Sequence, residues 1–310
     1  MRLCTVSADG VGAFFGVELK NRILRIAPAA RTFGLPEKSQ AYFLSSLDYF
    51  TNLPASEKAL RGLLKDVTEK PRQLARPAPD GQPYLFDRAK VTYLPPIPRP
   101  GKILCIGQNY RDHCEEQKRE IPTTPMVFNK FSTSLLGHGA SVPLPLKVDN
   151  NVDYEAELAV VIGKTATRVT KRTAMKHVAG YMIMNDVSLR QIQKAEKQWS
   201  RAKGWDGSGP CGPVIVTVDE IPNPHDLNIS CLVNGKFMQK SNTKHLIFDV
   251  PTLISFITQL VTLEPGDIIS TGTPGGVGAY RTPPVFLKDG DKVEVRIDRI
   301  GSLVNSCVAR

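Results

Sequence analysis

A series of short β-prone runs after Pro100 limits the possible fold more than any other feature of this chain. Apolar and β-branched residues form each run, and turn-forming residues separate them, as in strands joined by tight connections. Helical patterns are fewer and do not alternate regularly with the strands, so the sequence predicts a β-rich α+β fold. The predicted strands are Ile103–Ile106, Leu158–Ile162, Gly180–Met184, Val214–Thr217, Asn228–Val233, Asp267–Thr271 and the alternating Val293, Val295 and Ile297; the predicted helices are Lys171–His177, Leu189–Lys203 and Val250–Val261.

The chain of 310 residues is long enough for about two domains. Residues 1–70 are predicted to form a small α/β domain, with a hairpin of Phe14–Leu19 and Ile23–Ile26 and an amphipathic helix over Ser56–Val67. Prolines are dense in residues 71–100 and fix the backbone, which predicts an extended linker or wrapping segment. Residues 101–310 are then the larger domain.

Composition excludes several classes of protein. No apolar run approaches the ~18 residues of a membrane span, and the N-terminal segment lacks the apolar core of a signal peptide. The six cysteines are scattered without a C-x-x-C pair, which indicates reduced thiols and an intracellular protein. The net charge is +10, but basic residues are interleaved with acidic ones and the densest patch, Lys194–Lys203, contains one aromatic residue, Trp199. We therefore expect no nucleic-acid or membrane partner and favour attraction of small anions.

Acidic residues alternate in the segment Asp153-Tyr-Glu155-Ala-Glu157, directly before an apolar run. On a continuous strand the three acidic side chains would share one face, where their repulsion would be relieved by a cation. Oxygen ligands of this kind suit Mg²⁺ or Mn²⁺, and also Ca²⁺, better than Zn²⁺. The alternative is a solvated strand end.

Asp186 follows the predicted strand Gly180–Met184. Alone it could be the N-cap of a helix, but it could also be a third oxygen ligand beside Glu155 and Glu157. Three carboxylates would hold an octahedral ion and leave positions for substrate.

His113 and Glu116 are three residues apart after the strand Ile103–Ile106. On a helical turn they would lie on one face, where the carboxylate could orient the imidazole as a general base. A surface histidine beside acidic neighbours is the alternative.

Two further segments could bind an anionic substrate. On one helix Arg190 and Gln193 would share a face. Arg190 could clamp a substrate carboxylate in bidentate fashion, with Gln193 and Lys203 as further donors. The alternative is a solvated helix face. The glycine-rich Thr271–Gly278 lacks the P-loop and dinucleotide patterns, so its N–H groups and the Thr273 hydroxyl are better suited to a substrate carboxylate.

Together and in this order, these segments resemble the fumarylacetoacetate hydrolase family. The resemblance is specific from about residue 101 to the C-terminus, and Gly16–Leu19 and Pro283–Lys288 extend it over most of the chain. The matching segments are Gly107–His113, Asp153–Lys164, Gly180-Tyr181 with Asn185–Ser188, Lys203 with Gly212-Pro213, Val233–Gly235 and Leu263–Pro274.

The resemblance implies a mixed β-roll catalytic domain, a smaller N-terminal domain and a homodimer. It implies a metal bound by Glu155, Glu157 and Asp186, with Asp153 as their neighbour. It also implies catalysis by His113, Glu116 and Lys203, with His113 and Glu116 on a segment that orders over the ligand, and substrate contacts from Arg190, Gln193 and Thr273. The founding hydrolase has a further aspartate ligand where this chain has Ile106, which makes fumarylacetoacetate a doubtful substrate.

The resulting hypothesis is a Mg²⁺- or Mn²⁺-dependent enzyme that binds a small 2-oxo acid and stabilises its enolate. The resemblance favours keto–enol tautomerisation of oxaloacetate, with C–C hydrolysis of acylpyruvates or similar β-diketo acids, or decarboxylation of oxaloacetate, as alternatives from the same intermediate. It implies a mitochondrial location in a eukaryote and a cytoplasmic one otherwise. A catalytically silent binding protein with a basic surface is the non-enzymatic alternative.

Overall fold

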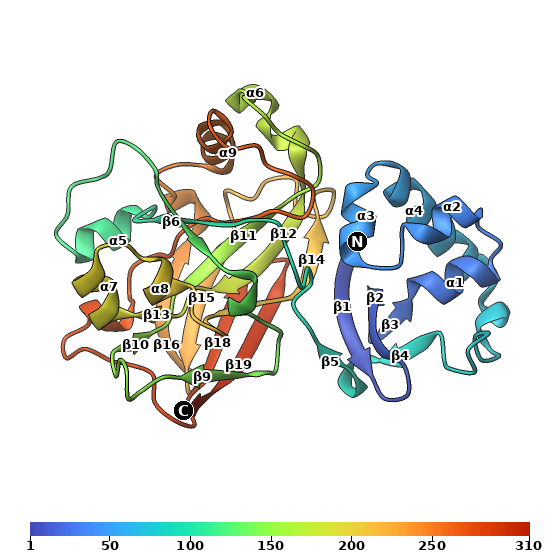
Figure 1. Ribbon diagram of the computed structural model, residues 1–310, viewed down its shortest axis with the longest axis horizontal. Helices are drawn as coiled ribbons and strands as arrows, with labels where there is room; N and C mark the ends of the chain where they lie inside the picture. The colour runs from blue at the N-terminus through green and yellow to red at the C-terminus, as the bar shows by residue number, and fades with distance from the viewer.

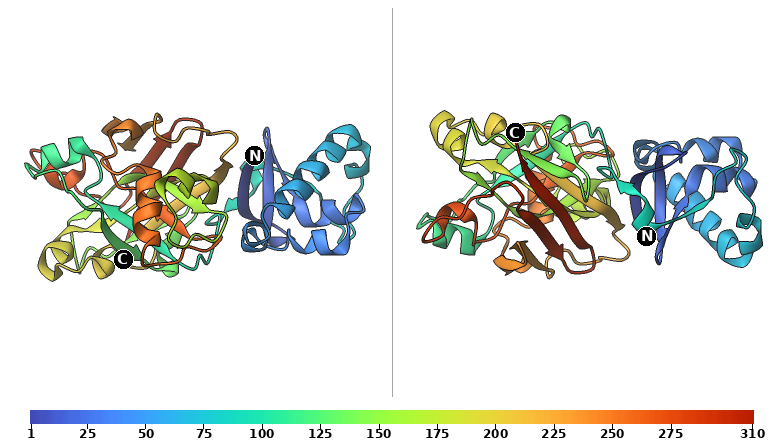
Figure 2. Two further views of the ribbon diagram at one scale, coloured as in Figure 1. Left: turned by 90° about the horizontal axis from the view of Figure 1, so that it is seen from above. Right: turned by 90° about the horizontal axis from the view of Figure 1, so that it is seen from below.

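The computed structural model describes residues 1–310 and shows a strand-rich α+β protein, as predicted. A small N-terminal unit, blue in Figure 1, stands beside a larger unit formed by the rest of the chain. The views in Figure 2 show the same two units side by side. No helix is long and apolar enough to span a membrane.

One mixed sheet runs through both units, because β1 of the N-terminal unit pairs antiparallel with β14 of the larger unit. Parallel pairing occurs between β6 and β17 and between β8 and β14. In sheet order the strands are β4 (Leu85–Asp87), β3 (Arg22–Arg25), β2 (Gly12–Leu19), β1 (Arg2–Ala8), β14 (Gly209–Thr217), β12 (Val178–Asn185), β11 (Ala156–Ile162), β17 (Ile268–Ser270), β6 (Ile103–Gly107) and β7 (Met126–Lys130), with β5 (Thr92–Tyr93) beside β1 and β8 (Leu135–Leu136) beside β14.

A second sheet of five strands packs against the centre of the first, since β11 and β12 contact β15, β18 and β19. Two short strands, β10 and β13, form a separate pair near the site described below. The second sheet has the order β16 (Lys236–Asn242), β15 (Asn228–Val233), β18 (Lys292–Ile297), β19 (Gly301–Ala309) and β9 (Ser141–Leu144); the pair is β10 (Val152–Asp153) with β13 (Ser188–Leu189).

Strand β11 is buried on both faces. Leu158, Val160 and Ile162 join the core between the two sheets, whereas Ala159 and Val161 join the core that continues into the N-terminal unit. This position explains why the strand reads as a continuous apolar run rather than an alternating one.

Helices cover the outer face of the N-terminal strands (Figure 1). Ile26, Phe50 and Leu60 of these helices pack on Phe15 and Leu24 of the strands. The predicted hairpin and amphipathic helix are both present, as β2–β3 and α4. The helices are α1 (Ile26–Thr32), α2 (Glu37–Ala41), α3 (Ser46–Thr51) and α4 (Ala55–Glu69).

The proline-rich passage, residues 71–100, packs along the N-terminal unit and pairs with its strands. Its strands β4 and β5 pair with β3 and β1, and Tyr93 donates a hydrogen bond to the buried Glu18 (2.8 Å). Of the two interpretations of this passage, the wrapping segment is therefore the one observed.

The larger unit contains α5 (Arg111–Glu116), α6 (Lys171–Ala174), α7 (Arg190–Glu196), α8 (Ser200–Lys203) and α9 (Val250–Thr258), besides short 3₁₀ turns. The prediction of one helix over Leu189–Lys203 was wrong. The helix breaks at Lys197, whose φ is 60°, and the chain turns before α8 begins. Trp199 packs edge-on against Phe128 (centroids 5.3 Å apart), so tertiary packing overrides the local helical pattern here.

Candidate active site

A cavity of about 870 Å³ opens at the end of the central strands β11 and β6. Residues from β6, α5, α7, α8 and the glycine-rich loop after β17 line it. Of the residues predicted from the sequence, Glu116 and Asp186 contact its lining side chains, and the remainder are part of the lining: His113, Glu155, Glu157, Arg190, Gln193, Lys203 and Thr273.

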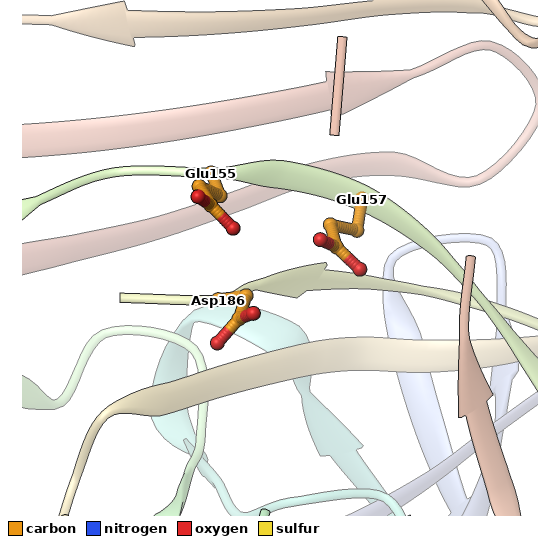
Figure 3. A group of neighbouring side chains, drawn as sticks. All are labelled: Glu155, Glu157 and Asp186. Atoms are coloured by element: carbon orange, nitrogen blue, oxygen red, sulfur yellow. The ribbon is translucent and has the colours of Figure 1, made fainter. Parts of the chain in front are cut away.

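Glu155 and Glu157 line the floor of the cavity, and Asp186 lies beside them (Figure 3). One carboxylate oxygen from each lies within 4.8 Å of the others, and all three side chains are buried. Strand pairing brings them together: Ala156 of β11 is opposite Asn185 of β12, and the Asp186 N–H donates to the Glu155 carbonyl (2.9 Å). Asp186 does not begin a helix, so the alternative of an N-cap was wrong.

The segment from Asp153 to Glu157 is not one continuous strand, contrary to the first interpretation. β10 ends at Asp153 and β11 begins at Ala156. The Asp153 carboxylate accepts hydrogen bonds from the N–H groups of Gly278 (2.7 Å) and Ala279 (2.9 Å) and from Arg190 Nε (2.9 Å). Asp153 is therefore a neighbour of the triad, and it ties the glycine-rich loop to Arg190.

Two buried lysines and the partly buried Arg190 surround two of the triad carboxylates. Lys203 Nζ lies 2.5 Å from Glu155 Oε2 and 2.9 Å from Asp186 Oδ2. Arg190 Nη2 lies 2.7 Å from Glu155 Oε1. Lys130 Nζ lies 2.9 Å from Asp186 Oδ1 and also donates to the Lys203 carbonyl and to Ser208.

The two glutamates of the triad consequently differ. Burial raises the pKa of Glu155, but the neighbouring Lys203 and Arg190 outweigh it, so this pKa lies below its ordinary value. Burial and the adjacent Asp186 and Glu155 carboxylates raise the pKa of Glu157. Burial opposes the charge of Lys203, yet Asp186 and Glu155 hold its pKa above the ordinary value, so Lys203 remains an ammonium.

Glu157 has no lysine or arginine partner. Its Oε2 accepts from Ser270 Oγ (2.5 Å) and from the Gly272 N–H (3.0 Å). Hydrogen bonds from neutral donors do not balance a buried carboxylate beside two others, so the floor of the cavity lacks positive charge at this point.

His113 and Glu116 share one face of α5, as predicted, with His113 Nδ1 2.7 Å from Glu116 Oε1. Gln117 Nε2 lies 2.6 Å from His113 Nε2, so the imidazole that donates to Glu116 accepts from Gln117. Glu116 Oε2 also accepts from the Gly276 N–H (2.7 Å). Asn109 anchors the turn before α5 by donating to the Thr271 carbonyl (2.8 Å).

The glycine-rich loop binds carboxylates of the protein itself. N–H groups of Gly272, Gly275 and Gly276 donate to Glu157, Asp112 and Glu116. These three N–H groups are therefore engaged by the protein itself, and binding of a substrate carboxylate by the remaining part of the loop at Thr273 stays a prediction. The Thr273 hydroxyl donates to the Ala156 carbonyl (3.0 Å) and accepts from Gln239 (2.8 Å), while Thr273 still lines the cavity.

Helix α7 presents Arg190 and Gln193 to the cavity, with Arg190 Nη1 donating to Gln193 Oε1 (3.0 Å). No side chain of its own segment caps the helix; instead Asp149 Oδ2 accepts from the N–H groups of Gln191 (2.9 Å) and Ile192 (3.1 Å). The Arg190 guanidinium pairs with Asp153 and Glu155, and a contact between Arg190 and a substrate carboxylate stays a prediction.

The protein family described as "Fumarylacetoacetate (FAA) hydrolase C-terminal" matches residues 102–308 of the chain. The chain belongs to the fumarylacetoacetate hydrolase family. The match covers nearly all of the larger unit and all three residues of the triad.

Relatives of known name extend the match into the N-terminal unit. The chain is 46% identical over 263 residues to "Oxaloacetate tautomerase Fahd2a, mitochondrial" of Rattus norvegicus, which is 84% of this chain and 83% of that protein. It is 45% identical over 241 residues to "Oxaloacetate tautomerase YisK" of Bacillus subtilis, or 76% and 80% of the two chains. A solved structure of maleylpyruvate hydrolase from Sphingobium sp. SYK-6, in complex with manganese(II) and pyruvate, superposes with a TM-score of 0.75 at 28% identity, over 100% of this chain and 99% of that one.

Proposed function

We propose that the protein is an oxaloacetate keto–enol tautomerase that uses Mg²⁺ or Mn²⁺. The observation that carries the proposal is the buried triad of Glu155, Glu157 and Asp186 at the floor of a cavity that His113 also lines. Its support is the name of the rat and Bacillus relatives, which are similar to this chain through both of its units.

The triad fits a divalent cation by its chemistry. Its ligands are carboxylate oxygens, the type that Mg²⁺, Mn²⁺ and Ca²⁺ prefer, and Glu157 lacks any other positive partner. The manganese ion in the structure of the Sphingobium relative supports the same assignment. When bound, such an ion would supply Lewis-acid stabilisation of the negative charge that develops on the 2-oxo group during enolisation.

The chain's own residues bind the substrate anion and offset its charge. Gln193 Oε1 is occupied by Arg190, which leaves the Gln193 amide N–H groups as donors to the substrate. Lys203 stays protonated and buried beside the triad, so its role is electrostatic stabilisation rather than proton abstraction. Thr273 forms part of the wall beside them.

We assign proton transfer at C3 of oxaloacetate to His113. In the enol-to-keto direction a proton leaves the enol oxygen and a proton is added at C3, so no water is consumed and no C–C bond breaks. Glu116 orients the ring through Nδ1 and is itself fixed by Gly276. Gln117 is hydrogen-bonded to His113 Nε2. The Gln117 side chain therefore has to turn away before His113 Nε2 can exchange a proton with the substrate.

The decisive experiment compares two reactions in one preparation. Decay of enol-oxaloacetate is followed by absorbance, and hydrolysis of acetylpyruvate is followed by pyruvate release, each with and without Mg²⁺. The proposal predicts metal-dependent enol decay with little pyruvate release. Faster metal-dependent hydrolysis than tautomerisation would replace the proposal by the hydrolase alternative.

The size of the cavity favours testing hydrolysis beside tautomerisation. At about 870 Å³ it exceeds what a four-carbon acid fills, and apolar groups from Phe128, Tyr280 and Phe286 form part of its wall. A longer acylpyruvate could therefore enter. Decarboxylation would be recognised in the same assay by release of CO₂ from oxaloacetate.

The proposal includes a homodimer. Apolar side chains that a partner could cover lie at the end of α9, where Leu260 is 95% exposed and Phe256 and Val261 are also exposed. Light scattering after size-exclusion chromatography tests this, and a monomer mass at micromolar concentration would reject it. The name of the rat relative supports a mitochondrial location if the source is a eukaryote.

A further inference from the structure

The basic residues that line the cavity fall into two groups. Arg190 and Lys203 lie at its floor and are held by protein carboxylates, at 2.7–2.9 Å for Arg190 and 2.5–2.9 Å for Lys203. Arg119 and Lys194 also line the cavity but are exposed and have no carboxylate of the chain within ion-pair distance. The cavity therefore has two cations whose charge the protein itself does not balance.

The chain holds these two cations on separate elements. The Arg119 N–H donates to the Cys114 carbonyl (3.0 Å), so Arg119 is attached to the last turn of α5, which carries His113. Lys194 lies one turn after Arg190 on α7 and hence on the same helix face. The basic neighbours Lys118, Lys197 and Arg201 do not line the cavity, and Arg201 pairs with Glu196 (3.1 Å).

The chemistry of a dicarboxylate substrate requires such a pair. When the carboxylate and 2-oxo group of oxaloacetate lie at the triad, its second carboxylate extends away from the floor. There a guanidinium and an ammonium are the side-chain groups best suited to bind it. The floor cations cannot serve both ends, since protein carboxylates already engage them.

We propose that Arg119 and Lys194 bind the second carboxylate of a dicarboxylic 2-oxo acid and select it over substrates that end in a neutral group. This inference rests on the proposed function and names the residues that determine its substrate class.

The test uses two substrates that differ only at the far end: enol-oxaloacetate and the enol of its 4-methyl ester. We expect R119Q and K194Q each to lower kcat/KM for oxaloacetate by about three- to tenfold, mainly through KM, with a larger loss in the double variant. For the ester we expect changes below about twofold. K118Q and K197Q, which remove neighbouring charges outside the cavity, are the matched controls and should leave both substrates unaffected.

Equal losses for both substrates, or none for either, would overturn the inference. If the wild-type protein fails to turn over oxaloacetate at all, the proposed function fails instead. Calorimetry on the Mn²⁺-loaded protein then tests the inference. R119Q and K194Q should weaken binding of oxaloacetate relative to wild type, and should leave binding of the ester nearly unchanged. Both residues are exposed, so the variants should fold, and thermal melting checks that they do.

Discussion

At the scale of single residues, the two glutamates of the triad show how environment separates identical side chains. Glu155 has Lys203 and Arg190 as partners and a lowered pKa, whereas Glu157 lies beside two carboxylates and has a raised one. A divalent cation would remove the repulsion that raises the pKa of Glu157. Metal binding and full ionisation of Glu157 are therefore expected to be linked.

Replacing His113 tests the assignment of the general base. We expect H113A to lower kcat for enol-oxaloacetate by about 10²–10⁴-fold, the usual range for losing such a group, while the affinity for Mn²⁺ changes little. Stopped-flow absorbance and calorimetry measure the two quantities. H177A, at a half-buried histidine outside the cavity lining, is the control, and a loss below about threefold in H113A would remove His113 from the mechanism.

The residues that could be predicted from the sequence were those inside dense local motifs. Glu155 and Glu157 belong to one acidic segment, and His113 and Glu116 to one helical turn. Lys130 was missed because its partner Asp186 is 56 residues away and nothing beside Lys130 is acidic. The one available signal was a lysine two positions after the apolar Phe128, on the same strand face.

At the scale of elements, α7 depends on a residue outside it. Asp149 caps its first turn and so fixes the direction from which Arg190 and Gln193 reach the cavity. The sequence predicted that these two residues share a helical face, but it could not predict the break at Lys197. That break places Lys203 beside Glu155 through packing of Trp199 on Phe128, a contact between distant segments.

Removing this cap should reduce stability and substrate affinity together. We expect D149A to lower the free energy of unfolding by about 0.5–2 kcal/mol, the usual cost of losing an N-cap, and to raise KM more than it lowers kcat. Denaturant unfolding and steady-state kinetics provide the measurements. Because asparagine caps helices about as well as aspartate, D149N is the matched variant and should stay near wild type. A KM unchanged in D149A would show that α7 needs no external cap.

At the scale of the whole molecule, one sheet connects the small unit to the site. Strand β11 contributes side chains to both hydrophobic cores, and its register with β12 brings Glu155 and Glu157 close to Asp186. Alternation and turn residues allowed the strands to be predicted one by one. Their order could not be predicted, because pairings such as β1 with β14 join residues more than two hundred positions apart and leave no local pattern.

Two half-buried histidines should make stability depend on pH. His138 Nδ1 accepts from the Val304 N–H (3.1 Å) and His225 Nε2 accepts from the Val250 N–H (3.1 Å), which each ring can do only when that nitrogen is unprotonated. Burial lowers the pKa of both, reinforced by Arg88 near His138. The unfolded chain then binds protons more readily, so the free energy of unfolding should fall as pH drops below about 6.5.

Urea unfolding at pH 7.5, 6.5 and 5.5 measures this dependence. The double variant H138Q/H225Q, in which neither position can gain a proton, should show a flatter profile between these values than the wild type. A wild-type profile as flat as that of the variant would mean that neither histidine titrates differently on folding.

The central claim is that the buried triad holds the divalent cation on which tautomerisation depends. Its most direct test is enol-oxaloacetate decay catalysed by protein stripped with a chelator and then titrated with Mn²⁺. The structure predicts that stripped wild-type protein is inactive and recovers with one Mn²⁺ per chain, whereas E155A and E157A, folded by circular dichroism, neither bind Mn²⁺ nor recover. Normal turnover by the stripped wild-type protein, or Mn²⁺-dependent turnover by E157A, would contradict it.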